Sequence, residues 1–91
     1  MDNKIEIKLI DGIFNEENAK EIILTMINKK IEFNEIKGLG NLVKRNEEDN
    51  HLEQRIKELK MQRQNIINHF NNNNNNESFE IQAVIRINPI L

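Results

Sequence analysis

The chain has 91 residues, 37% hydrophobic and 31% charged, which predicts one small domain with little apolar surface to offset the conformational entropy lost on folding. It contains no cysteine, which excludes disulfides, thiolate catalysis and thiolate metal sites. Its net charge of −2 comes from interleaved acidic and basic residues, so we expect no broad field directed at nucleic acid or an anionic membrane.

The first predicted element is a strand over residues 4–10, where apolar and charged residues alternate as in a strand with one solvated face. The apolar positions are Ile5, Ile7 and Leu9, and the charged positions between them are Glu6 and Lys8. Asp11 and Gly12 then predict a turn, because glycine adopts positive φ without a steric penalty and aspartate hydrogen-bonds to its own backbone.

The second predicted element is a helix over residues 16–30. Asn15 is a good N-cap, and Glu16 and Glu17 bring carboxylates to the positive end of the helix dipole. The apolar residues that follow recur at spacings of three and four, which is typical of an amphipathic helix. These residues are Ala19, Ile22, Ile23, Met26 and Ile27.

Residues 31–45 are predicted to be irregular, since Ile31, Glu32 and Phe33 alternate like a strand and two nearby glycines are typical of a turn. A second helix is predicted over residues 47–70, where one stripe of residues recurs at spacings of four and three. The stripe consists of Leu52, Ile56, Leu59, Arg63, Ile66 and Phe70. Either it packs on the first helix or the sheet, or it forms a seam with the same helix of another subunit.

The C-terminal part is predicted to be a loop followed by a strand. The asparagine-rich stretch 71–77 should end the second helix, because asparagine bonds to its own backbone and tolerates the left-handed conformation. Strict alternation predicts a strand over residues 78–88, and Pro89 ends it because proline cannot donate to a ladder. The apolar positions of this strand are Phe79, Ile81, Ala83, Ile85 and Ile87.

These elements predict an α+β fold of order β-α-α-β, as a single domain over residues 1–91, with the terminal strands in a two-stranded antiparallel sheet packed on two helices. An isolated two-stranded sheet is marginal in water and has open edges, so we expect oligomerisation, as a dimer or a larger homo-oligomer, to complete the fold. The surface predicted to contact another subunit or a protein partner consists of Leu52, Ile56, Leu59, Arg63, Ile66, Phe70, Phe79, Ile81 and Ile85.

No constellation of residues predicts catalysis, a cofactor site or a metal site. His51 and His69 lie on one predicted helix, roughly 27 Å apart at 1.5 Å per residue, so they cannot share an intramolecular site. The glycines near residue 40 lack the rest of a phosphate-binding motif. Ser78, the only serine, belongs to no nucleophile elbow. We therefore expect no enzyme activity.

Weak nucleic-acid binding through Arg55, Lys60 and Arg63 of the second helix is the alternative function. Acidic residues are interleaved with these cations, and Glu53 is placed to pair with Lys57 at the favourable spacing of four. No aromatic residues lie among them to stack on bases. A solvated helix face paired with its own acids is the preferred interpretation, and no nucleic-acid partner is expected.

Three short motifs run through residues 10–33. They are Ile10-Asp11-Gly12-x-Phe14, Glu17-x-Ala19-Lys20-Glu21-Ile22 and Lys30-Ile31-x-Phe33. In these motifs the chain resembles a group of short uncharacterised bacterial proteins with no known activity. The resemblance implies a bacterial cytosolic protein and carries no activity, cofactor or partner with it.

The sequence therefore predicts a small, non-enzymatic, self-associating protein with a scaffolding or protein-binding role. The N-terminal residues run straight into the alternating pattern of the first strand, so neither a signal peptide nor a membrane span is expected. We expect a cytoplasmic location, no membrane partner and no cofactor.

Overall fold

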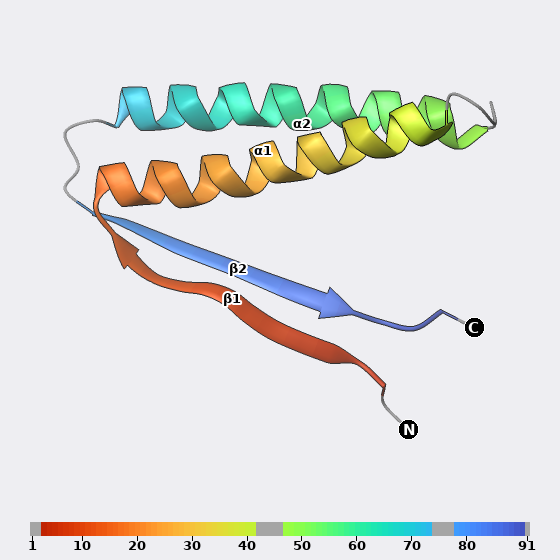
Figure 1. The fold of residues 1–91 in the computed structure, drawn as a ribbon. Helices are drawn as coiled ribbons and strands as arrows, with labels where there is room; N and C mark the ends of the chain where they lie inside the picture. The colour runs from red at the N-terminus through yellow and green to blue at the C-terminus, as the bar shows by residue number, and fades with distance from the viewer. Residues whose placement is uncertain (1–2, 42–46, 74–77, 91) are drawn as a thin grey trace.

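The computed structural model of the protein describes residues 3–41, 47–73 and 78–90. The elements, in chain order, are β1 (Ile5–Phe14), α1 (Glu16–Asn41), α2 (Glu47–Asn72) and β2 (Phe79–Ile87) (Figure 1). The two strands pair antiparallel in a two-stranded sheet, and this sheet packs against the two helices. The predicted α+β fold of order β-α-α-β is confirmed.

β1 continues beyond its predicted end, so the turn predicted at Asp11 and Gly12 is wrong. Gly12 lies in the ladder opposite Ile81, and its neighbours on both sides are paired as well. The interruption falls instead at Leu9, an extra residue between two paired neighbours, which is a β-bulge. Pairing with β2 through this region outweighs the local turn preference of the Asp-Gly dipeptide.

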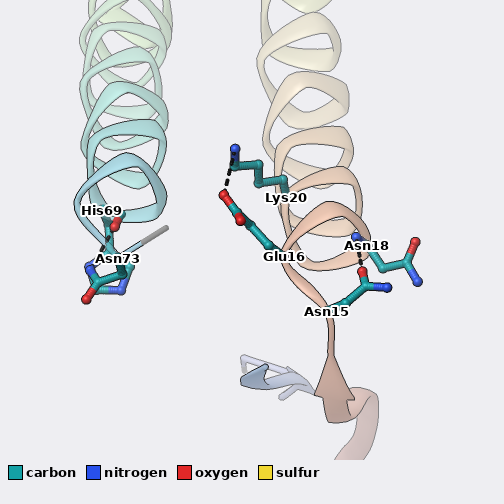
Figure 2. A network of polar contacts seen from close by, with 6 residues as sticks. All are labelled: Asn15, Glu16, Asn18, Lys20, His69 and Asn73. Atoms are coloured by element: carbon teal, nitrogen blue, oxygen red, sulfur yellow. Dashed lines mark hydrogen bonds and ion pairs between the residues drawn. The ribbon is translucent and has the colours of Figure 1, made fainter. Parts of the chain in front are cut away.

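The N-terminus of α1 is capped as the sequence predicts. Asn15 Oδ1 accepts a hydrogen bond of 2.8 Å from the backbone N–H of Asn18, in the first turn of the helix (Figure 2). Glu16 and Glu17 occupy the same turn, and Glu16 Oε1 lies 3.1 Å from Lys20 Nζ. The cap and the acidic first turn fix the start of α1, with only Asn15 between the strand and the helix.

α1 is much longer than predicted. The irregular structure predicted for residues 31–45 is wrong as far as Asn41, where the helix ends, and residues 42–46 lie outside the described part of the chain. Ile31 and Asn34 are each 3% exposed and lie one turn apart, on the side of α1 that packs against α2. This packing outweighs both the local strand-like alternation and the helix-weakening glycine that follows one turn later.

α2 ends at Asn72, two residues inside the stretch 71–77 that the sequence predicts as a loop. Asn73 closes the helix, because its backbone N–H donates to the His69 carbonyl at 3.1 Å and its side-chain Nδ2 donates to the same oxygen at 2.8 Å (Figure 2). The asparagine tract thus supplies the donors that the last turn of a helix lacks. The rest of this predicted loop, residues 74–77, lies outside the described residues.

The sheet has one apolar face and one mostly polar face. Along β2, successive side chains alternate between the two faces without interruption. In β1 the bulge at Leu9 shifts the alternation by one residue, so the apolar residues before and after the bulge lie on the same face. The apolar face consists of Ile5, Ile7, Ile10, Gly12, Phe14, Phe79, Ile81, Ala83, Ile85 and Ile87. On the polar face, Arg86 Nε lies 3.5 Å from Oε2 of Glu6 on the neighbouring strand.

The helix pair and the sheet meet at one end of the molecule, the closed end, where β1 leads into α1. There the rings of Phe70 and Phe79 pack edge to face, with centroids 4.9 Å apart. From this end the strands run away from the helices toward the two termini, the open end (Figure 1). The molecule is wide and thin, with extents of 48 × 37 × 14 Å. Its radius of gyration is 16.5 Å, against roughly 12 Å for a compact domain of this length.

Replacing Asn15 by alanine should lower the free energy of unfolding by about 1 kcal/mol, because the backbone N–H of Asn18 loses its acceptor. Asn18→Ala is the matched control, since Asn18 contributes only its backbone to the cap and alanine is the better helix former. Urea unfolding followed by circular dichroism measures both variants. Equal losses for the two would contradict the assigned cap.

Candidate interaction surface

The stripe predicted on the second helix lies in the seam between α1 and α2. Leu59 is 6% exposed, and Arg63 Nη1 donates a hydrogen bond of 2.7 Å to Oδ1 of Asn28 on α1. The half-buried apolar members of the stripe are Leu52, Ile56 and Ile66. Within the chain the stripe thus packs on α1, and a seam with the same helix of another subunit stays a prediction.

Three further residues of the predicted surface lie at the closed end. Phe70 is buried, and Phe79 and Ile81 are half-buried. They line a shallow, largely apolar groove between the helix pair and the start of β2, together with Ile23 and Ile66. The polar residues around it are Asn65, His69 and Glu80. The groove is therefore suited to apolar side chains from outside the chain.

The last residue of the predicted surface, Ile85, lies on the apolar face toward the open end and is 39% exposed. Its neighbours on that face are more exposed still, with Ile87 at 53%, Ile5 at 51% and Ile7 at 49%. These three are absent from the predicted surface. Their alternation identifies them as members of an apolar face, but only the divergence of helices and sheet leaves that face uncovered.

α1 shows a similar gradient of exposure along one face. Ala19, Met26 and Phe33 recur every seven residues and therefore lie on the same side of the helix. Ala19, at the closed end, is fully buried, whereas Met26 is 37% and Phe33 59% exposed. Lys30 Nζ lies 4.9 Å from the centroid of the Phe33 ring and shields part of it. Burial on this face thus declines as the strands leave the helix.

The chain leaves more surface accessible than a monomeric domain of its size. Its accessible surface area is 7712 Å², whereas a monomeric protein of this mass exposes about 5,500 Å². The excess of about 2,200 Å² is larger than the roughly 800 Å² that each partner contributes to a standard protein–protein interface. The uncovered part of the apolar face belongs to this excess.

The basic residues considered for nucleic-acid contact are paired within the chain. Arg55 Nη1 lies 3.0 Å from Oε2 of Glu58, and Lys60 Nζ lies 3.6 Å from Oε2 of Glu35 on α1. Arg63 is engaged by a side chain of α1, as described above. These contacts reduce the positive field that α2 presents to a phosphate backbone.

Among residues 3–41, 47–73 and 78–90, no group of three or more His, Cys, Asp or Glu side chains is placed to hold a metal ion. In the same part of the chain, no helix is both long and apolar enough to cross a membrane. No protein-family model, curated protein or solved structure matches the chain.

Leu59→Ala should lower the free energy of unfolding by about 2–5 kcal/mol, because it leaves a cavity in the seam between α1 and α2. Met61 lies on the outer side of the same helix and is 67% exposed, so Met61→Ala should change this free energy by less than about 0.5 kcal/mol. Urea unfolding of both variants measures the difference. A comparable loss for Met61→Ala would show that the seam is placed on the wrong side of α2.

Proposed function

We propose that the protein is a non-enzymatic, self-associating protein with a scaffolding or protein-binding role, and that self-association covers the apolar face of its sheet. The proposal is carried by the exposure of four isoleucines on one continuous face at the open end. They are Ile5, Ile7, Ile85 and Ile87. An exposed apolar patch is typical of a protein-interaction site, and the excess accessible area supports the same function.

Covering these isoleucines in a dimer contributes a free energy comparable with the cost of association. Full burial of an isoleucine contributes roughly 1.5–3 kcal/mol, and each of these side chains is already about half covered. Two copies together hold eight such side chains, so the gain is on the order of 8 kcal/mol. Association costs about 4–15 kcal/mol in translational and rotational freedom. The isoleucines thus supply a large share of the binding free energy, and further contacts must add to it.

We place the protein in the cytoplasm of a bacterium. A sequence without cysteine suits a reducing compartment, where disulfides are rare. The resemblance of residues 10–33 to short bacterial proteins supports the same location. Nucleic-acid binding is the less favoured function, because the cations of α2 already meet acceptors in their own chain.

Sedimentation velocity at micromolar concentration should show a dimer or a larger oligomer. Ile87→Lys should shift the protein toward the monomer, because burying an unpaired ammonium in the interface is unfavourable. Met61→Lys is the matched control, since it introduces the same side chain at an exposed apolar position on the outer side of α2. It should leave the measured mass unchanged.

A monomer for the unaltered chain would overturn the proposed self-association. An Ile87→Lys variant that associates as well as Met61→Lys would show that the protein associates through a surface other than the apolar face.

A further inference from the structure

We propose that two copies of the chain associate through β2, which pairs edge to edge and antiparallel with the partner's β2 about a two-fold axis at Ala83. The groove at the closed end of each copy then covers the exposed end of the other copy's β2. This arrangement rests on the proposed self-association and adds to it the strand, the register and the residues that meet.

β2 is the better pairing edge of the two strands. Among the described residues each strand has a single neighbour in the sheet, so each presents one row of unpaired backbone N–H and C=O groups. On β1 this row is interrupted by the bulge at Leu9, and bulges are a common means of blocking edge pairing. β2 has no such interruption from Phe79 to Ile87, so its free row is regular.

The charges of β2 select one antiparallel register. Ala83 is the central residue of the strand, and pairing about it places Glu80 opposite the partner's Arg86 on the polar face. By symmetry Arg86 lies opposite the partner's Glu80, so the register forms two oppositely charged pairs. No other antiparallel register sets these two residues opposite each other. Such pairs stabilise a sheet, whereas like charges directly opposite destabilise it.

On the apolar face, the same register sets each covered residue of β2 opposite an uncovered one. Phe79 lies opposite the partner's Ile87, and Ile81 lies opposite the partner's Ile85. Phe79 and Ile81 line the groove at the closed end, whereas Ile85 and Ile87 are the most exposed residues of β2 on this face. The side chains that the fold leaves uncovered in one copy therefore meet the apolar groove of the other.

Arg86 is within reach of this contact on the polar face. Its Nε lies 3.5 Å from Oε2 of Glu6 of its own chain, so the partner's Glu80 would join an exposed ion pair that already exists. The resulting sheet has four strands in the order β1-β2-β2-β1, with both helix pairs on one face, which removes the weakness of a two-stranded sheet. The excess accessible area of about 2,200 Å² per chain exceeds the roughly 800 Å² per partner that a stable dimer needs.

Disulfide trapping tests the register directly, because the chain has no cysteine of its own. Residues directly opposite in antiparallel strands have Cα atoms about 4.5–5.5 Å apart, which a disulfide can span. Ala83→Cys should therefore form covalent dimers in most chains under mild oxidation. Glu80→Cys alone should not, because its two copies lie roughly 20 Å apart in this register. A mixture of Glu80→Cys and Arg86→Cys chains should form the mixed disulfide.

Light scattering of the unaltered chain separates this inference from the proposed function. A monomer would overturn both. A dimer could also form without being trapped by Ala83→Cys or by the mixture of Glu80→Cys and Arg86→Cys chains. This result would leave self-association standing and overturn the β2 register. Trapping by Ile7→Cys instead would assign the interface to β1. Circular dichroism checks that each variant is folded. If Ala83→Cys does not fold, the mixture of Glu80→Cys and Arg86→Cys chains decides the test alone. Both residues are exposed on the polar face, so their replacement leaves the core of the fold unchanged.

Charge reversal gives a second measurement. Glu80→Lys should weaken dimerisation by about ten-fold or more, because both symmetric pairs become contacts between like charges. Glu53→Lys is the matched control, since it makes the same change at an exposed position of α2. Equal dissociation constants for the two variants in sedimentation equilibrium would contradict the pairing of Glu80 with Arg86.

Discussion

The contact between Phe70 and Phe79 determines how the parts of this molecule are arranged. It joins the last turns of α2 to the first residue of β2, with ring centroids 4.9 Å apart and an interplanar angle of 68°. Edge-to-face aromatic pairs have a preferred geometry as well as a large buried area, so the contact restricts how α2 and β2 lie relative to each other where they meet. Because it lies near one end of both elements, the long helices and the twisted strands diverge beyond it (Figure 1).

Because the helix pair and the sheet meet only at the closed end, the molecule has two separate buried regions, and the helices bury side chains more fully than the strands do. Ile31 and Leu59 are buried in the seam between the helices, and Ala19 and Phe70 are buried near the closed end. The helix pair therefore stabilises itself along its length. The strands at the open end have only each other, and a two-stranded sheet alone is marginal in water. Contacts from outside the chain would stabilise the sheet more than they would stabilise the helices.

The features that the sequence predicts correctly are those set by close neighbours in the chain. The alternation in β2 and the cap at Asn15 depend on a few adjacent residues, and both identify their elements. The region after residue 30 is different, because its local alternation resembles a strand and only the burial of Ile31 against α2 favours a helix. Likewise, Gly12 has the local signature of a turn, and its pairing with Ile81 depends on a strand that comes much later in the chain.

The sequence predicts which residues of the candidate surface share a face, but it does not predict what that face contacts. Heptad spacing correctly groups the residues of the α2 stripe on one side of the helix, yet spacing does not specify what that side contacts. The answer lies in the pairing of α2 with α1, which a single-element pattern does not contain. The exposure of Ile5, Ile7 and Ile87 depends on the angle between helices and sheet, which meet at the closed end beside the aromatic contact.

Polar groups in the helix seam favour the proposed association through the sheet over association through the helices. Arg63 donates a charge-assisted hydrogen bond of 2.7 Å to Asn28, and polar groups in a helix seam favour the alignment in which they are satisfied. Moving α2 into a seam with another subunit would break this bond and expose Leu59. Pairing at the edge of β2 breaks no contact within the chain and covers side chains that are otherwise solvated. The interactions already formed inside the helix pair thus support the proposal that association takes place at the sheet.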